Sequence, residues 1–346
     1  MKHKKQRHHG YDAKDGDNAP GNLGYDAKDR DNTPGNRRYD RRDFLKTATA
    51  LLPLSVLAGL PASAASAGRQ SATPLLSFST LGCPDWTYGR ILDFAAANGY
   101  AGLEIRGIQR QLDLSQSPHF NSPANILTTR TMAEDKGLRF VDLGSSAEMH
   151  HPEGPVRQKN MDEVRRFIDL AHELHCPYIR VFPNNLPEDQ DRDATIGLII
   201  QGLLESGKYA EGGDVTVLME SHGELTHSRD LEKIMRSARH PHVGLVWDIV
   251  NMWSATKESP AEVYPVLKDY IRHTHIKDLR FVDGKEQYVL LGKGEAPIFE
   301  GIDALVKGGY KGYYSFEWEK LWHPEIGDPE IALADYPVAM RKHFKQ

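Results

Sequence analysis

The segment Val215-Thr216-Val217-Leu218-Met219-Glu220-Ser221-His222 contains a pattern that recurs through most of the chain. A short apolar run, of the length typical of a buried strand, ends directly in acidic and imidazole side chains. Three later segments repeat this arrangement: Gly244–Asp248, Thr274–Ile276 and Tyr313–Glu317. We therefore expect four buried strands that carry polar side chains near their C-terminal ends.

Amphipathic stretches separate these runs and extend the alternation towards the N-terminus. In one of them Val164, Phe167 and Ile168 recur at helical spacing, and glycine-containing joints end several such stretches just before the next apolar run. Four earlier strand candidates follow the same pattern: Leu76–Leu81, Gly102–Arg106, Arg139–Leu143 and Tyr178–Phe182.

Eight strand–helix units in about 270 residues predict a single α/β domain, a (β/α)8 barrel of the triosephosphate isomerase (TIM) type, over residues 68–346. A doubly wound open sheet is the alternative. It is less favoured because no Gly-x-Gly-x-x-Gly turn follows the first strand candidate.

Composition excludes several classes of protein. The 346 residues are 39% hydrophobic and 26% charged, which is ordinary for a globular chain, and two cysteines cannot form a disulfide framework. The net charge of −5 conceals an uneven distribution, because residues 1–67 carry +4 and the remaining 279 carry −9. An acidic body repels phosphate backbones, so we expect no nucleic-acid partner.

The first 67 residues differ from the rest. Residues 1–40 hold few aliphatic side chains and contain a direct repeat, Gly10–Asp15 and Gly24–Asp29, each with the sequence Gly-Tyr-Asp-Ala-Lys-Asp. A stretch of this composition buries too little apolar surface to offset the entropy lost on ordering, so we predict disorder.

Residues 41–67 resemble a twin-arginine export signal. Arg41-Arg42-Asp43-Phe44-Leu45-Lys46 precedes an apolar run, Thr47–Leu60, that is too short to span a bilayer, and small residues suited to cleavage follow. The resemblance implies export of the folded protein by the twin-arginine machinery, a periplasmic or otherwise exported location, and no membrane association after cleavage.

Four polar side chains stand near the ends of consecutive strand candidates: Glu220, Asp248, His275 and Glu317. In a barrel these ends surround one mouth, so the side chains can converge. Three converging carboxylates repel one another, and a divalent cation would neutralise them. Three carboxylates with one imidazole and no thiolate favour Mn²⁺, Mg²⁺ or Co²⁺, with Zn²⁺ as a further candidate.

Several short motifs follow one another in order from about Leu76 onwards. They are Gly102-Leu103-Glu104-Ile105-Arg106, Glu220-Ser221-His222-Gly223, Trp247-Asp248, His275-Ile276-Lys277-Asp278, Leu291-Gly292-Lys293-Gly294-Glu295 and Phe316-Glu317-Trp318-Glu319. In these motifs the sequence resembles the xylose isomerase-like barrels of the sugar phosphate isomerase/epimerase superfamily. The resemblance implies that Glu220, Asp248, His275 and Glu317 bind the metal, and that Glu220 and Glu317 also face the substrate from opposite sides.

Such a site supports removal of a proton next to a carbonyl group, with Glu220 and Glu317 as the catalytic pair and an enediolate stabilised by the metal. We expect a metal-dependent sugar isomerase or epimerase whose partner is a small carbohydrate. One alternative is a lyase or hydratase that uses the same groups on 3-oxo-glycosides. Another is a non-catalytic periplasmic sugar-binding module, and self-association into a homo-oligomer is left open.

Six further residues are candidates for substrate binding. Asn251 stands where ketohexose epimerases of this family usually carry His, and an amide can hydrogen-bond a substrate but cannot transfer a proton at neutral pH. Glu104 and Arg106, at the end of one strand candidate, are expected to pair across the mouth, and Trp86 to stack on a sugar face. The full set is His222, Lys277, Asn251, Glu104, Arg106 and Trp86.

Overall fold

The computed structural model of the protein describes residues 73–345, which belong to one compact unit, Ala67–Gln346. The predicted extension, residues 1–40, and the predicted export signal, residues 41–67, lie outside the described residues. No helix in the described part of the chain is long and apolar enough to cross a membrane.

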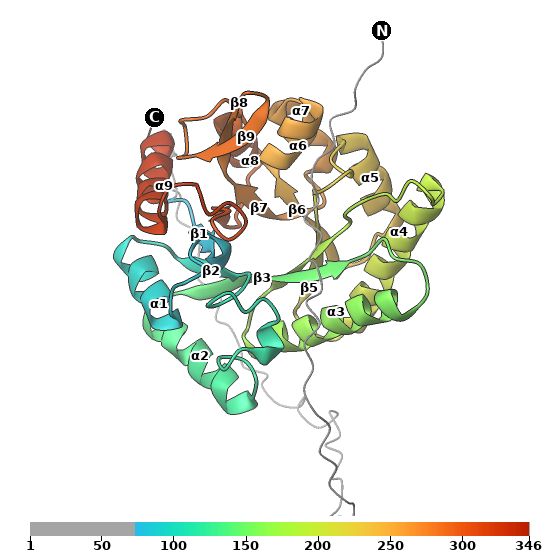
Figure 1. Ribbon diagram of the computed structural model, residues 1–346, viewed down its shortest axis with the longest axis horizontal. Helices are drawn as coiled ribbons and strands as arrows, with labels where there is room; N and C mark the ends of the chain where they lie inside the picture. The colour runs from blue at the N-terminus through green and yellow to red at the C-terminus, as the bar shows by residue number, and fades with distance from the viewer. Residues whose placement is uncertain (1–72, 346) are drawn as a thin grey trace, which may run out of the picture. The chain divides into compact units, whose positions relative to one another are not determined.

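Eight parallel strands close into a barrel, which confirms the predicted (β/α)8 fold. Their order around the ring is β1-β10-β7-β6-β5-β4-β3-β2, and the helices lie outside it (Figure 1). The barrel strands are β1 (Leu76–Ser79), β2 (Gly102–Ile105), β3 (Arg139–Glu148), β4 (Tyr178–Phe182), β5 (Thr216–Glu220), β6 (Val243–Asp248), β7 (Ile271–Ile276) and β10 (Tyr314–Phe316).

The helices begin and end where local sequence signals place them. The Thr87 side chain accepts a hydrogen bond from the first turn of α1, and Gly99, Gly137 and Gly309 follow α1, α2 and α8 with φ of 74°, 72° and 77°. The helices are α1 (Tyr88–Ala97), α2 (Pro123–Asp135), α3 (Pro155–Glu173), α4 (Arg192–Tyr209), α5 (Ser228–Ser237), α6 (Ile249–Thr256), α7 (Pro260–Leu267), α8 (Ile298–Lys307) and α9 (Pro329–Phe344).

Two strands form a hairpin outside the barrel, and the apolar pattern does not reveal them. β8 (Asp278–Val282) and β9 (Lys285–Val289) pair antiparallel and are mostly exposed or half-buried. Asp283-Gly284 joins them, with both residues at positive φ, so this dipeptide is the local signal for the hairpin.

Some barrel strands are longer or shorter than predicted. β7 starts at Ile271 rather than Thr274. The apolar pattern missed its first residues because the polar side chains of Arg272 and His273 interrupt the run, although His273 is fully buried. β3 continues to Glu148 through a register shift against β4. β1 stops at Ser79, where a short 3-10 turn begins.

Two glycine substitutions should change stability in opposite directions. Gly137 has a φ of +72° and no atom near an added Cβ, so Gly137→Ala should cost about 1 kcal/mol of unfolding free energy through backbone strain. Gly197, inside α4, also has open space around an added Cβ, so Gly197→Ala should add about 0.5–1 kcal/mol. Urea unfolding measures both, and changes of the same sign would contradict this account.

Candidate metal centre

Four neighbouring strands bring together the four residues predicted as metal ligands. Glu220 ends β5, Asp248 ends β6, His275 lies in β7, and Glu317 follows β10. The strand register places His275 beside both Asp248 and Ser315. One oxygen or nitrogen atom from each of the four residues lies within 4.8 Å of the others.

The imidazole of His275 lies at the centre of this group. Its Nδ1 atom is 3.1 Å from Glu220 Oε1, 3.3 Å from Glu317 Oε1 and 3.8 Å from Asp248 Oδ2. All four side chains are buried; the most exposed, Glu317, is 5% exposed. Three carboxylates therefore face one ring nitrogen in an environment with little water.

The other ring nitrogen of His275 faces a fourth carboxylate, deeper in the barrel. Glu104 Oε2 is 3.1 Å from His275 Nε2 and 3.0 Å from His273 Nε2, and it accepts a hydrogen bond from Ser315 Oγ at 3.1 Å. Burial raises the pKa of Glu104, but the two imidazoles outweigh burial and lower it overall. Glu104 is therefore held as an anion beneath His275.

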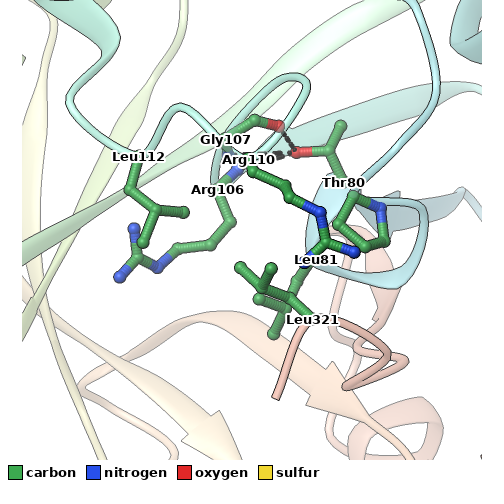
Figure 2. A pocket seen from close by; sticks show the side chains of 8 residues that line it. Thr80, Leu81, Arg106, Gly107, Arg110, Leu112 and Leu321 are labelled. Carbon is green, nitrogen blue, oxygen red and sulfur yellow. Dashed lines mark hydrogen bonds between the residues drawn. The ribbon is translucent and has the colours of Figure 1, made fainter. Parts of the chain in front are cut away.

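The expected pairing of Glu104 with Arg106 is wrong, because Glu104 bonds to the histidines instead. Arg106 donates to the backbone oxygen of Gly144 at 3.4 Å and to Ser146 Oγ at 2.9 Å. Its backbone N–H donates to the Thr80 hydroxyl beside a small pocket at the ends of β1 and β2 (Figure 2).

Lys277 extends into the carboxylate group from the end of β7. Its Nζ atom is 2.8 Å from Asp248 Oδ2, 2.8 Å from Glu317 Oε2 and 2.5 Å from Glu319 Oε1. Burial lowers the pKa of Lys277, but these carboxylates outweigh it and hold the pKa well above its usual value. A buried ammonium therefore balances part of the negative charge.

The pKa values of the four candidate ligands diverge. Burial raises the pKa of Glu220, but the nearby His275 and Arg180 outweigh burial and lower it. Burial likewise raises the pKa of Glu317, and His275 and Lys277 outweigh it and lower the pKa. Burial raises the pKa of Asp248 to about 7 despite Lys277. Burial lowers the pKa of His275, but Glu317, Glu104 and Glu220 raise it well above normal. These shifts describe a site that retains a proton when no cation is bound.

The donor atoms fit a divalent cation. Glu220 Oε2 and Asp248 Oδ2 are buried and make no well-directed hydrogen bond among the described residues, although the cationic groups of Arg180 and Lys277 contact them at 3.2 and 2.8 Å. His275 Nδ1 faces the same space. Asp248 Oδ1 is occupied differently, because it accepts a hydrogen bond from the Asn251 backbone at 2.8 Å and so caps α6. Carboxylate oxygens with one imidazole are a suitable ligand set for Mn²⁺ or Mg²⁺.

A family model described as the xylose isomerase-like TIM barrel matches residues 92–335. The chain belongs to this family. No curated protein matches the chain significantly.

Solved structures show the same fold at low sequence identity. D-psicose 3-epimerase from Clostridium cellulolyticum H10 superposes with a TM-score of 0.62 at 15% identity, over 77% of this chain and 97% of that one. The 3-keto-D-glucoside 4-epimerase of E. coli gives 0.62 at 14%, over 78% and 99%. A probable 3-DHS dehydratase from Bacillus anthracis gives 0.61 at 16%, over 77% and 98%.

Two further residues predicted to bind substrate have other contacts in this xylose isomerase-like barrel. His222 is half-buried, its Nδ1 atom is 2.9 Å from Asn184 Oδ1, and its ring packs on Phe182. Trp86 is 4% exposed, and its ring packs against Phe94 on α1 and beneath the Arg90 guanidinium, so the indole has a packing role.

Sequence reasoning missed several charged residues that complete the site. Arg180 Nε is 3.2 Å from Glu220 Oε2, and Asp142 is fully buried near Glu104 and Arg180. Each stands between two apolar residues inside a strand, which is the signal that could have revealed them. The missed residues that contact the cluster are Arg180, His273, Ser315 and Glu319.

Removing the carboxylate beneath His275 should strongly destabilise this xylose isomerase-like barrel. Glu104→Ala leaves buried imidazoles unpaired, and the loss of one partner from a buried ion pair costs about 3–5 kcal/mol. Glu330→Ala, which removes an exposed partner of Arg90, should cost less than about 1 kcal/mol. Denaturant unfolding of both variants measures the difference, and equal losses would contradict it.

Mn²⁺ should stabilise the protein more as pH rises. Because the pKa of His275 is raised in the folded protein, the proton on this imidazole stabilises the cation-free fold, and does so fully below the usual histidine pKa. This stabilisation is lost as the pH rises through the raised pKa. A cation must displace that proton. The increase in unfolding temperature caused by Mn²⁺ should therefore grow from about pH 6 to about pH 8. If the rise in unfolding temperature caused by Mn²⁺ stays constant or becomes smaller as pH increases, this coupling between proton release and cation binding is wrong.

Proposed function

We propose that the protein is a divalent-cation-dependent isomerase or epimerase that removes a proton next to the carbonyl group of a sugar. One observation carries the proposal: two glutamates from strands that are not neighbours meet around one imidazole. Glu220 comes from β5 and Glu317 from the end of β10, with β6 and β7 between them in the ring. Their carboxylates therefore approach the space above His275 from different sides.

The chain's own residues have distinct roles in this reaction. Glu220 and Glu317 are held ionised, so that one can accept a proton from the substrate carbon and the other, once protonated, can return one. Lys277 donates to Glu317 Oε2 and fixes the orientation of that carboxylate. A bound divalent cation would supply Lewis-acid stabilisation of the negative charge that develops on the substrate oxygens.

Elimination from a 3-oxo-glycoside is the second candidate, and one residue favours it. Asn251 occupies the first turn of α6, and its amide cannot transfer a proton at neutral pH. In an elimination, the glutamate that removes the α-proton can pass it to the oxygen of the departing substituent, so no proton donor is needed at the position of Asn251. The two reactions differ in their products: an isomer of equal mass, or two fragments.

Glu317→Gln should reduce turnover by about 10²–10⁴-fold, because the amide cannot accept or return a proton. The measurement incubates the Mn²⁺-loaded protein with ketohexoses and 3-oxo-glucosides in deuterated water, and follows deuterium at the α-carbon by mass spectrometry. Glu325→Gln is the matched control, since Glu325 is exposed on the loop that follows the same strand.

Three results would distinguish the hypotheses. Deuterated isomers of unchanged carbon skeleton support isomerisation or epimerisation, and cleavage products support elimination. Saturable sugar binding with no deuterium incorporation in the unmodified protein would support a binding module and overturn the catalytic proposal. Full activity in Glu317→Gln would remove this residue from the mechanism.

A further inference from the structure

A second group of metal-binding side chains lies beyond the end of β3. Glu148 is the last residue of that strand, and His150 and His151 follow it. One donor atom from each of the three lies within 4.8 Å of the other two. None of these residues belongs to the group around His275.

The spacing of the three side chains suits a bound cation. His151 Nε2 is 2.9 Å from Glu148 Oε2, and the two imidazole ring centroids are 4.1 Å apart. Two ligand atoms bound tetrahedrally to Zn²⁺ stand about 3.3 Å apart, given bonds of about 2.0–2.1 Å. A widening of a few tenths of an ångström would therefore bring the Glu148–His151 pair to the spacing of two ligands on one ion.

His150 supplies an independent indication of a ligand. Its side chain is 7% exposed, and its Nδ1 atom is buried without a hydrogen-bond partner among the described residues. A buried imidazole whose Nδ1 atom makes no hydrogen bond can bind a metal through that nitrogen.

Two asparagines from other elements of the same chain hold Glu148 in place. The Glu148 backbone N–H donates to Asn160 Oδ1 on α3 at 2.8 Å, and Asn184 Nδ2 donates to Glu148 Oε1. Glu148 Oε2 therefore remains directed at His151. Hydrogen bonds that orient a ligating carboxylate in this way are typical of metal sites.

We propose that Glu148, His150 and His151 form a second cation site that takes Zn²⁺ or Co²⁺. Two imidazoles and one carboxylate favour these borderline cations, whereas the carboxylate-rich group around His275 favours harder ones. Three protein ligands leave a fourth position free for water or a hydroxyl group. The proposal does not depend on the reaction assigned to the main site.

The second site is connected to the mouth of the barrel. Asn184, which donates to Glu148, also lies with its Oδ1 atom 2.9 Å from His222 Nδ1. His222 follows the candidate ligand Glu220 by two residues. A hydroxyl group bound at the open position would therefore lie on the same side of the barrel as the main site.

Titration of the untagged full chain with Zn²⁺, followed by calorimetry, tests the proposal, with Co²⁺ absorption as a second probe. His151→Ala and Glu148→Gln should each lower the number of bound Zn²⁺ ions by one and abolish the corresponding Co²⁺ band. His172→Ala is the matched control, because His172 forms an imidazole–carboxylate pair of similar length with Asp214, at 3.0 Å, but in a more exposed position and with no third ligand among the described residues. His3, His8 and His9 are present in every variant and cancel in the comparison.

A further variant separates the two sites. Glu220→Gln should weaken cation binding at the site around His275. The Zn²⁺ ion at the second site should remain bound in this variant. Far-UV circular dichroism checks that each variant is folded, and the 24% exposure of the His151 side chain favours this. If folded His151→Ala and Glu148→Gln bind as many Zn²⁺ ions as the unmodified chain, the second site does not exist.

Discussion

The imidazole of His275 contacts carboxylates at both of its nitrogens, and the arrangement of the barrel interior depends on this interaction. Glu104 faces Nε2 from within the barrel, while Glu220, Asp248 and Glu317 surround Nδ1. Buried carboxylates are costly unless they are paired, so this many of them require positive charge close by. His275, Lys277 and Arg180 supply it.

The geometry of a single strand organises that charge. His273, His275 and Lys277 alternate along β7 and its extension, so their side chains lie on the same face. His273 reaches Glu104, His275 reaches Glu104 and Glu220, and Lys277 reaches Asp248 and Glu317. One strand thus carries positively charged or proton-binding groups from the barrel interior to its mouth. The neighbouring strands supply the matching carboxylates.

The two candidate cation sites differ in chemistry and in the way the fold builds them. Four barrel strands contribute to the group around His275, and its burial comes from closure of the whole ring. Glu148, His150 and His151 come from one strand end and the residues directly after it. The first depends on tertiary structure, whereas the second depends on local chain direction and on the support of Asn160 and Asn184.

Much of the architecture could be predicted from the sequence, because strand burial and helix ends leave local patterns. Apolar runs located all eight barrel strands, and the glycine-containing joints marked several helix ends, as the positive φ of Gly99, Gly137 and Gly309 shows. The pattern failed where polar residues occur inside strands: it began β7 too late and ended β3 too early. The β8–β9 hairpin was missed because its strands are largely exposed and lack an apolar run.

The candidate ligands Glu220, Asp248, His275 and Glu317 could also be read from the sequence, since each stands near the end of an apolar run. The partners of each residue could not. Glu104 and Arg106 lie two residues apart and suggest a local pair, yet closure of the barrel brings Glu104 to His273 and His275, which are more than 160 positions away. Sequence alone determined the fold and the kinds of side chain at the mouth. Tertiary structure decided which charges neutralise one another, because ring closure sets the distances between strands remote in the chain.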